Sequence, residues 1–366
     1  MRKLFLYPLS LIYGMVISIR NWLYDLKLLK SVDFDTPVIS IGNITVGGTG
    51  KTPHTEYLIK LLKSQFRVAT LSRGYKRKTK GFLLVSTNSD VTEIGDEPLQ
   101  MKKKFSGVTV SVCENRVTGV ENLLAVDSPP DVILLDDAYQ HRRINPGLNI
   151  LLIDYNKPLR DDHLLPYGRL RESRKQLRRA NIIIITKCPT EIAPITRRIM
   201  TKEVFLFPYQ ELFFTTMVYG QLYPVFPEAP KMDLFTDTWR MGILLVTGIA
   251  SPEYVVQHVK KLSAEVDTAI FPDHHYYTEN DIHLIVQKFY RLQSSRRIIV
   301  TTEKDVVRLT KPDLFTPEVN SSVYFLPIQV KFLDKEGKLF DKKILDYVGE
   351  NKSNRELHIR QSKSKN

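Results

Sequence analysis

The sequence predicts an α/β protein with a doubly wound parallel sheet, a second and smaller α/β domain, and an apolar helix at the N-terminus. Short runs rich in Val, Ile and Leu, typical of strands buried on both faces, alternate with segments of helical spacing through most of the chain. A glycine-rich loop follows the first of these runs. A second strand–helix series begins after an aromatic segment interrupted by prolines. These features favour two α/β domains in one chain.

The expected strands share short length and a high content of β-branched and aliphatic residues. They are Val38–Ile41, Arg67–Leu71, Val108–Val112, Val132–Leu135, Asn149–Asp154, Asn181–Thr186, Gly242–Thr247, Arg297–Thr302 and Phe325–Phe332. Helical spacing lies between them, as in Asn115–Leu124. Ligands of a doubly wound sheet bind at the carboxyl ends of its strands, so we expect the functional residues there.

Composition divides the chain into five parts. We expect a membrane-associated helix at 1–30, the larger, phosphate-binding domain at 31–210, a connector at 211–235, the second domain at 236–340 and a polar, disordered tail at 341–366. The chain of 366 residues, with 43% hydrophobic and 25% charged residues, has a globular composition that suffices for two domains.

Charge and cysteine content limit the possible partners. The net charge of +13 predicts an anionic partner, which is nucleic acid, anionic lipid or a phosphorylated substrate. No RNA-binding motif, zinc finger or helix-turn-helix signature accompanies the charge, so we do not expect nucleic acid. Cys113 and Cys188 form neither a disulfide framework nor a metal-binding spacing, which favours a reducing, cytoplasmic setting.

The N-terminal segment is apolar and flanked by cations. The apolar run at 4–19 is shorter than the roughly 20 residues that span a bilayer. No small-x-small cleavage site follows it, and Arg20, Trp22 and Tyr24 add the cations and aromatic rings typical of a membrane interface. We expect a helix on the cytoplasmic face of the membrane, attached peripherally or by a single span. Packing against the protein's own core is the alternative.

The strongest motif follows the strand Val38–Ile41. Three glycines precede a Lys-Thr pair, and helical spacing starts at Thr55; the motif residues are Gly47, Gly48, Thr49, Gly50, Lys51 and Thr52. Strand, glycine loop, Lys-Thr and helix together predict a phosphate-binding loop and a P-loop NTPase-like domain. Backbone N–H groups and the helix N-terminus bind the phosphates, Lys51 reaches the β/γ oxygens, and the Thr52 hydroxyl binds Mg²⁺.

One position departs from the usual phosphate-loop pattern. A glycine normally stands five residues before Gly50, where this chain has Thr45. Gly47 and Gly48 are able to supply the turn instead. The alternative interpretation is a glycine turn that binds nothing, but the full context favours binding of a nucleoside triphosphate.

Two acids end the strand Val132–Leu135. Asp136 and Asp137 are the expected magnesium partners of a phosphate loop, since Mg²⁺ prefers carboxylate oxygens. A solvated loop is the alternative. Gln140, His141 and Arg142 follow and are positioned to face the γ-phosphate.

Other motifs are ambiguous when taken singly. The segment 95–98 contains Asp96 and is typical of a turn before a helix, and His274 and His275 in a loop are often surface residues. From Arg171 onward, basic residues at helical spacing predict a basic stripe that attracts phosphate groups or is simply solvated; they are Arg171, Arg174, Lys175, Arg178 and Arg179.

Taken together, these motifs resemble those of the tetraacyldisaccharide 4′-kinase family, the lipid A kinases of Gram-negative bacteria. The matching segments are Gly42–Pro53, Ser72–Tyr75, Gly95–Pro98, Leu134–Arg142, Gly168–Glu172, Phe271–His275 and Thr302–Asp305. The resemblance covers nearly the whole chain, to about Leu333. Where the family more often has Gly-Phe after the acid pair, this chain has Ala138 and Tyr139.

The resemblance implies ATP-dependent phosphorylation of the 4′-hydroxyl of a tetraacylated glucosamine disaccharide 1-phosphate, with ATP and Mg²⁺ as cofactors. It implies that Asp96 is the general base and that His274 from the second domain pairs with it, with His275 as the alternative. Glu172 is implied as a further Mg²⁺ ligand. Closure of the domains would then exclude water. We expect a monomer that acts on its lipid substrate at a membrane surface.

A second hypothesis from a different class is a P-loop nucleotide switch that binds and releases a partner. The segment at 186–189 resembles a guanine-reading motif, but Pro189 stands where that motif needs an aspartate. The low cysteine content argues against metal delivery. The set of motifs, rather than the composition, favours the kinase.

Overall fold

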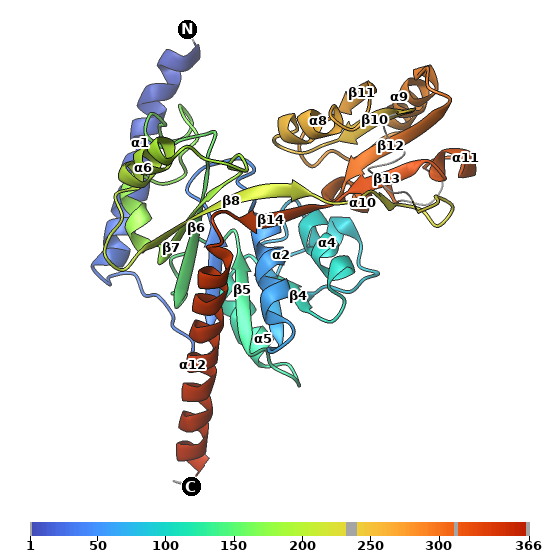
Figure 1. The fold of residues 1–366 in the computed structure, drawn as a ribbon. Coiled ribbons are helices and arrows are strands. Elements are labelled where there is room, and N and C mark those ends of the chain that lie inside the picture. Colours follow the sequence, from blue (N-terminus) through green and yellow to red (C-terminus); the bar gives the residue numbers. More distant parts are fainter. Residues whose placement is uncertain (1, 232–239, 311–313, 364–366) are drawn as a thin grey trace. The chain divides into compact units, whose positions relative to one another are not determined.

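The computed structural model describes residues 2–231, 240–310 and 314–363 (Figure 1). The chain forms two compact units. Unit 1 consists of Met1–Asn88, Met101–Met217 and Val330–Asn366, and unit 2 of Ser89–Gln100 and Val218–Gln329. The segment Ser89–Gln100 therefore belongs to a different unit from the sequence on either side of it. A linear division of the chain does not give this arrangement.

Unit 1 is built on a large, mostly parallel sheet with nine strands among the described residues, in the order β14-β8-β7-β6-β1-β5-β2-β4-β3. Their bounds are β1 Val38–Gly42, β2 Val68–Ser72, β3 Leu83–Leu84, β4 Thr109–Val112, β5 Val132–Asp136, β6 Leu148–Asp154, β7 Ile182–Thr186, β8 Glu211–Tyr219 and β14 Ile328–Phe332. Strand β1 pairs in parallel with β5 and β6, so the glycine loop leaves the middle of the sheet. At the edge of this sheet, β3 pairs antiparallel with β4.

The helices of unit 1 precede, separate and follow these strands in the sequence. They are α1 Arg2–Asp25, α2 Lys51–Leu62, α5 Arg116–Leu124, the 3₁₀ helix η1 Arg174–Arg179, α6 Pro194–Val204 and α12 Gly337–Lys363, while α3 Val91–Ile94 and the start of α4 Asp96–Lys104 belong to unit 2. Asn115 caps α5 by accepting from the N–H groups of Val117 and Thr118. The predicted doubly wound α/β architecture is confirmed.

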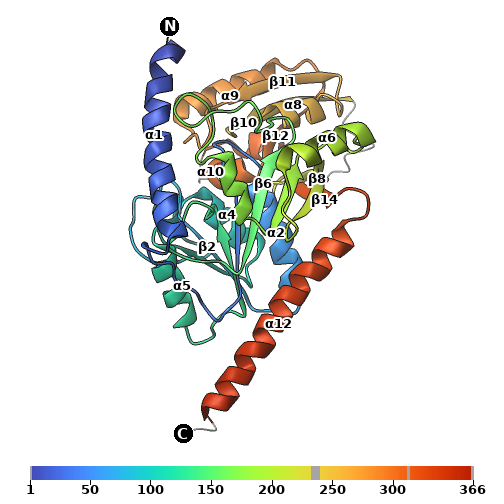
Figure 2. The same ribbon diagram turned by 90° about the vertical axis from the view of Figure 1, so that its left-hand side faces the viewer.

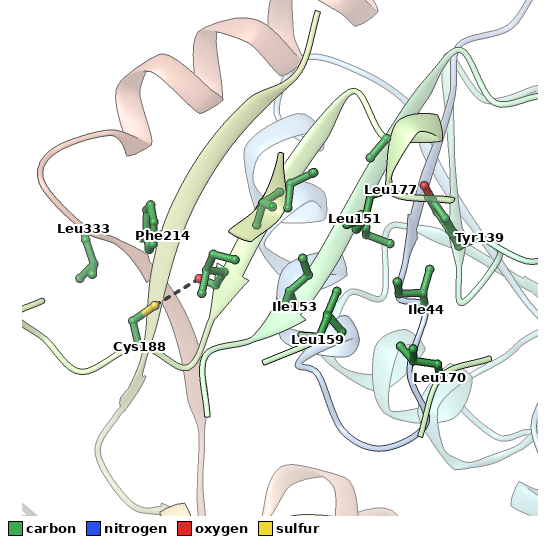
Figure 3. Close-up of a cluster of buried hydrophobic side chains, with 14 residues drawn as sticks. Ile44, Tyr139, Leu151, Ile153, Leu159, Leu170, Leu177, Cys188, Phe214 and Leu333 are labelled. Carbon is green, nitrogen blue, oxygen red and sulfur yellow. Dashed lines mark hydrogen bonds between the residues drawn. The ribbon is translucent and has the colours of Figure 1, made fainter. Parts of the chain in front are cut away.

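A buried cluster on one face of the sheet contains residues of three of the sequence motifs (Figure 3). Ile44 of the glycine-rich loop, Tyr139 beside the acid pair and Leu170 pack with Leu151 and Ile153 of β6. Burial of one such side chain contributes about 1.5–3 kcal/mol. The hydrophobic core therefore fixes the loops that carry the candidate functional residues.

Unit 2 contains a second sheet, with five strands among the described residues in the order β11-β10-β12-β13-β9. The bounds are β9 Tyr223–Pro224, β10 Met241–Thr247, β11 Glu265–Ile270, β12 Arg296–Thr302 and β13 Val323–Leu326, with helices α8 Glu253–Val259, α9 Glu279–Arg291, α10 Glu303–Leu309 and α11 Pro317–Asn320. Separate buried clusters contain the alternating residues of β10, with Leu244 in one and Ile243 in the other. This is the smaller α/β domain that the sequence predicts.

Two expected segments differ in the structure. The segment expected as a connector at 211–235 begins with β8, a strand of the large sheet, and its residues 232–235 lie outside the described residues. The single strand expected at Phe325–Phe332 is two strands, β13 and β14, because Pro327 lies between them and has no N–H to donate to a ladder.

The expectation of a disordered tail at 341–366 is wrong for residues up to 363, which belong to helix α12. Phe340, Ile344 and Val348 are buried and recur every four residues, so they form an apolar stripe on one face of the helix. The many lysines of this segment led to the expectation of disorder, although the apolar residues have helical spacing. Residues 364–366 lie outside the described residues.

Polar side chains connect helix α1 to the rest of unit 1. Ser10 Oγ donates to the carbonyl of Leu164 at 2.7 Å, and the Tyr13 hydroxyl donates to the carbonyl of Arg171 at 2.9 Å. Its large apolar side chains are exposed; they are Tyr7, Leu9, Leu11, Ile12, Met15, Val16, Ile19 and Trp22. Within residues 2–231, 240–310 and 314–363, no helix combines the length and apolar character needed to cross a bilayer.

Candidate active site

The glycine-rich loop connects the buried end of β1 to helix α2. Gly47 has φ 104° and Gly50 has φ 88°, the left-handed region in which a side chain is unfavourable. A Cβ on Gly50 would lie 2.5 Å from Cε of Met217. Lys51 is the first residue of α2, so the loop leads directly into the N-terminus of this helix. Backbone N–H groups at such a terminus bind anions.

Neighbouring strands hold this loop in place. Asn43 Nδ2 donates to Oγ1 of Thr49 at 2.8 Å, and Oγ1 of Thr186, at the end of β7, donates to the carbonyl of Thr49 at 2.8 Å. On its other side, the loop pairs with the segment around Leu170, through an isolated bridge to Thr45. These contacts fix the loop on both sides, and Gly47 and Gly48 are not part of the bridge between Thr45 and Leu170.

His54 gives the loop a further support that the sequence motifs did not indicate. Its ring is buried, with Nδ1 2.7 Å from the carbonyl of Gly50 and Nε2 3.1 Å from Oγ1 of Thr215 on β8. Burial lowers the pKa of His54 to about 4, so the ring is neutral at neutral pH. In that form Nδ1–H donates to Gly50 and Nε2 accepts from the Thr215 hydroxyl. The only sequence signal was a histidine one turn after the Lys-Thr pair.

The two acids lie at the end of β5, next to the start of α2. Lys51 Nζ is 3.5 Å from Oδ1 of Asp137, and Arg171 Nη1 is 3.1 Å from both carboxylate oxygens. Burial would raise the pKa of Asp137, but the charges of Lys51 and Arg171 outweigh it and lower the pKa. Asp136 is buried and accepts from Thr55 Oγ1 at 3.4 Å. The structure thus brings together Lys51, Asp136 and Asp137.

Glu172 has a different environment from these acids. Its carboxylate accepts from Asn21 Nδ2 of α1 at 3.2 Å and forms an ion pair with Arg179. Both contacts satisfy a buried charge. The described contacts of Glu172 therefore connect α1 to η1 and do not include Thr52 or the acid pair.

The residues after the acid pair also face inward or toward α1. Gln140 Nε2 donates to the carbonyl of Asn43 at 2.7 Å, and Arg142 pairs with Asp25 at 2.8 Å. Burial, with the charge of Arg116, lowers the pKa of His141 to about 4. Of the three, Gln140 contacts the phosphate loop directly.

The basic stripe expected from Arg171 onward is not a helix face. Residues Arg174–Arg179 form a 3₁₀ helix, which repeats every three residues and scatters positions that an α-helix would align. Arg171 pairs with Asp137, Arg178 pairs with Asp25, and Arg174 donates to the carbonyl of Glu203 at 3.1 Å. These arginines therefore make separate contacts, ion pairs for Arg171 and Arg178 and a backbone hydrogen bond for Arg174, and do not form the expected stripe.

A second cluster of candidate functional side chains lies entirely within unit 2. His274 Nδ1 donates to Oδ2 of Asp96 at 2.8 Å, and Arg308 pairs with the same oxygen. Lys304 Nζ donates to Nε2 of His274 at 3.1 Å, which assigns the proton to Nδ1. Burial would raise the pKa of Asp96, but the His274 hydrogen bond and the charges of Lys304 and Arg308 hold it well below its ordinary value.

The backbone around His274 is fixed by its neighbours. His274 has φ 58°, which is unusual for a residue other than glycine and asparagine, and its N–H donates to the carbonyl of Gly248 at 3.2 Å. Asp305 accepts from Gly248 N–H at 3.1 Å and from the hydroxyls of Thr247 and Thr302. These contacts hold the histidine loop against the start of α10.

His275 has a separate role from His274. Its Nε2 is 2.9 Å from Oδ2 of Asp281, and its ring stacks on Phe271 with centroids 4.8 Å apart. Of the two adjacent histidines, His274 is therefore the one that contacts Asp96.

Comparison with known proteins identifies the family. A model of the LpxK family, described as tetraacyldisaccharide-1-P 4′-kinase, matches residues 2–348. A tetraacyldisaccharide 4′-kinase of Phocaeicola vulgatus is 48% identical over 351 residues, which cover 95% of this chain and 96% of the relative. This chain belongs to the tetraacyldisaccharide 4′-kinase family.

Two further relatives support the assignment. A kinase of the same name from Bacteroides thetaiotaomicron is 47% identical, with 98% of this chain and 96% of the relative covered. A crystal structure of LpxK from Aquifex aeolicus in complex with ATP is similar at a TM-score of 0.72 and 32% identity, covering 95% of this chain and 99% of that chain. The kinase family that the sequence motifs indicated is confirmed.

In this member of the kinase family, the residues around Lys51 fit a magnesium ion that binds together with nucleotide phosphates. Mg²⁺ is usually held by one or two carboxylates, phosphate oxygens and waters. Asp136 and Asp137 at the end of β5 offer carboxylates of this kind, and Thr52 in the first turn of α2 offers a hydroxyl. Among the residues that the structure describes, no three His, Cys, Asp or Glu side chains gather into a site for an ion bound by protein alone.

The sequence motifs did not indicate Arg308, which contacts Asp96 in the structure. Lys304 and Asp305 stand four and three residues before Arg308 in the short helix α10, so they share a side of the helix with it, and all three contact the cluster. The spacing of three residues between Asp305 and Arg308 was the available signal. Without the tertiary contact it is an ordinary helix-surface pair.

Proposed function

We propose that this kinase transfers the γ-phosphate of ATP to the 4′-hydroxyl of a tetraacylated glucosamine disaccharide 1-phosphate, a step of lipid A biosynthesis. The observation that carries the proposal is the contact of Lys51, at the start of α2, with Asp137 at the end of β5. A cation and a carboxylate at this edge of a parallel sheet suit a nucleotide–magnesium complex. The ATP bound by the Aquifex aeolicus relative supports the same nucleotide.

On the donor side, the loop residues Gly47 to Gly50 would surround the phosphates with backbone N–H groups. Lys51 would release Asp137 in part and contact the β- and γ-phosphate oxygens, since the 3.5 Å pair is long enough to be exchanged for a phosphate. Asp136, Asp137 and Thr52 would hold Mg²⁺. When bound, Mg²⁺ neutralises charge that develops on the transferred phosphoryl group.

On the acceptor side, Asp96 would accept the proton of the sugar hydroxyl. An aspartate paired with Arg308 and His274 is a weak base, which appears as its lowered pKa. Phosphoryl transfer passes through a loose transition state in which the nucleophile needs little activation. Asp96 therefore orients the hydroxyl first and takes its proton late. His274, which accepts a hydrogen bond from Lys304, would hold the Asp96 carboxylate in the orientation that proton acceptance needs.

We propose that the protein works at the membrane surface. The exposed apolar side chains of α1 suit a peripheral position on the cytoplasmic face of the membrane, where ATP is available. The lipid substrate would be reached there by a monomer. Glu172 would act on the site through Asn21 and Arg179 rather than as a Mg²⁺ ligand.

The test is transfer of labelled γ-phosphate from ATP to purified tetraacyldisaccharide 1-phosphate in detergent micelles, beside a Lys51→Ala control. We expect label on the lipid with the unsubstituted protein and none with the control. ATP hydrolysis without labelled lipid would refute the proposal and favour the nucleotide switch that binds and releases a partner.

A further inference from the structure

Helix α6 has an apolar outer face. Ile195 and Ile199 are 64% and 51% exposed, whereas surface helices usually place such residues inward. Exposed Arg198 and Lys202 lie on the same side of the helix, because positions three, four and seven residues apart share a face. The outer face therefore combines branched aliphatic side chains with two cations.

The opposite face of α6 is firmly packed on unit 1. Val204 is buried in the cluster of Figure 3, and Met200 packs against that cluster. The guanidinium of Arg197 lies 4.4 Å from the centroid of the Phe214 ring. The helix is thus anchored on its inner side, and its outer apolar residues do not result from a loosely attached helix.

The residue that ends α6 is unusual in both conformation and exposure. Phe205 has φ 49° and ψ 68°, a left-handed conformation that glycine or asparagine normally provides at this position. Its side chain is 78% exposed. A bulky residue is strained there and gains little from packing, so its presence points to a role outside the fold.

Aromatic residues extend this surface toward α1. Phe207 and Tyr209 are exposed and stacked, with ring centroids 5.6 Å apart. The Tyr209 hydroxyl donates to the carbonyl of Arg178 at 2.6 Å, and Arg178 pairs with Asp25, the last residue of α1. Figure 1 shows α1 and α6 on the same side of unit 1, and Figure 2 shows them at separate places on that side.

We propose that residues 195–209, hereafter the α6 surface, form a second membrane-contacting surface that inserts Ile195, Ile199 and Phe205 shallowly into an anionic lipid interface. Apolar side chains flanked by cations are the pattern of interfacial helices, and Arg198 and Lys202 match the negative charge of lipid phosphates. The proposal rests on the proposed lipid substrate, whose acyl chains hold it in a bilayer. Together with the exposed face of α1, a second contact would fix the orientation of unit 1 on the membrane.

The experiment compares the full-length protein with Phe205→Asn and with the double variant Ile195→Gln/Ile199→Gln. Binding to vesicles of phosphatidylethanolamine and phosphatidylglycerol is measured as a partition coefficient. We expect each variant to reduce it about tenfold, because apolar area is no longer removed from water. Leu84→Asn, which removes a side chain about as exposed as that of Ile199 from edge strand β3, should leave the coefficient unchanged.

Phe205→Asn separates lipid contact from folding. Asparagine tolerates the left-handed conformation, so this variant should unfold at a higher temperature than the unsubstituted protein while it binds vesicles more weakly. Opposite changes in the two measurements exclude damage to the fold. Increased salt should weaken binding of the unsubstituted protein, since Arg198 and Lys202 act by charge.

The proposal is overturned if the unsubstituted protein does not bind the vesicles, or if both variants bind as tightly as it does. It is also overturned if the unsubstituted protein self-associates without lipid and Phe205→Asn abolishes this, because the surface is then a protein interface. The micelle transfer assay decides the proposed function separately: absent lipid phosphorylation with weakened vesicle binding of the variants would refute the kinase assignment and leave the lipid surface in place.

Discussion

Replacing Asp96 with asparagine should abolish proton acceptance while it preserves the nucleotide site. Asparagine keeps the shape of the side chain and loses its charge. The phosphate loop, Lys51 and the acid pair belong to unit 1, whereas Asp96 and its partners belong to unit 2. We therefore expect ATP affinity to change little and turnover to fall by roughly 10²–10⁴-fold, the usual contribution of a general base.

The same substitution should also destabilise unit 2. Arg308 is almost fully buried and loses its ion pair with Asp96, and breaking such a pair costs about 3–5 kcal/mol. Asp305 remains 3.5 Å from Arg308, so we expect the lower end, about 3 kcal/mol. Because single domains are stable by about 5–15 kcal/mol, the variant should remain folded.

The assay combines steady-state transfer in micelles, calorimetric titration of ATP and urea unfolding. Asp281→Asn is the matched control, because Asp281 has the same type of contact, with His275 at 2.9 Å in the same unit. It should lose stability through the cap of α9 and retain turnover. This control separates loss of an Asp–His pair from loss of the base.

Two results would refute the reasoning. Full turnover by Asp96→Asn would remove Asp96 from the base role. An equal loss of turnover in Asp281→Asn would show that any disturbance of unit 2 is sufficient, and that the contact of Asp96 with His274 has no special function.

Three further predictions concern the loop and the pH dependence. Gly50→Ala should weaken ATP binding and cost about 1–3 kcal/mol, because of its φ of 88° and the 2.5 Å approach of the new Cβ to Met217; unchanged nucleotide titration would contradict this. His54→Phe should raise KM for ATP more than it lowers kcat, since it removes the donor to the Gly50 carbonyl and leaves Thr215 without that partner; equal changes in both would contradict a loop-positioning role. The pKa of Asp96 lies below its ordinary value, so its contribution to stability is complete above about pH 4 and declines as the pH falls further; the stability difference between the unsubstituted protein and Asp96→Asn should narrow with acidification below about pH 4, and a constant difference would refute it.

Local sequence patterns predicted most of the strands, and they identified the glycine loop and the acid pair that the structure places at the end of β5. The strand expected at Asn181–Thr186 is β7 at Ile182–Thr186, and the helix expected at Asn115–Leu124 is α5 with Asn115 as its cap. The glycine loop, Lys51 and the acid pair were recognisable because their chemistry depends on residues close together in the chain and on neighbouring parallel strands.

Local sequence patterns could not predict contacts between segments that are far apart in the chain. Ser89–Gln100 folds with unit 2 although the chain on both sides of it belongs to unit 1, and no local property of the sequence reports this. Arg308 reaches Asp96 across more than 200 positions of the chain (|i−j| = 212). Glu172 lies in a matching motif, yet its buried carboxylate contacts Asn21 and Arg179. The contact with Asn21 depends on the packing of α1, which local patterns do not report.

The departure of the phosphate loop from the usual pattern has a structural explanation. A glycine is required where the backbone has positive φ, and in this loop those positions are Gly47 and Gly50. Thr45 instead forms an antiparallel bridge with Leu170, and the flanking N–H of Val46 donates to the carbonyl of Arg169 at 2.8 Å. An extended, paired position favours a β-branched residue over glycine. The threonine therefore stabilises a loop that is anchored by the 169–171 segment. The backbone N–H groups of the glycines stay available for phosphate.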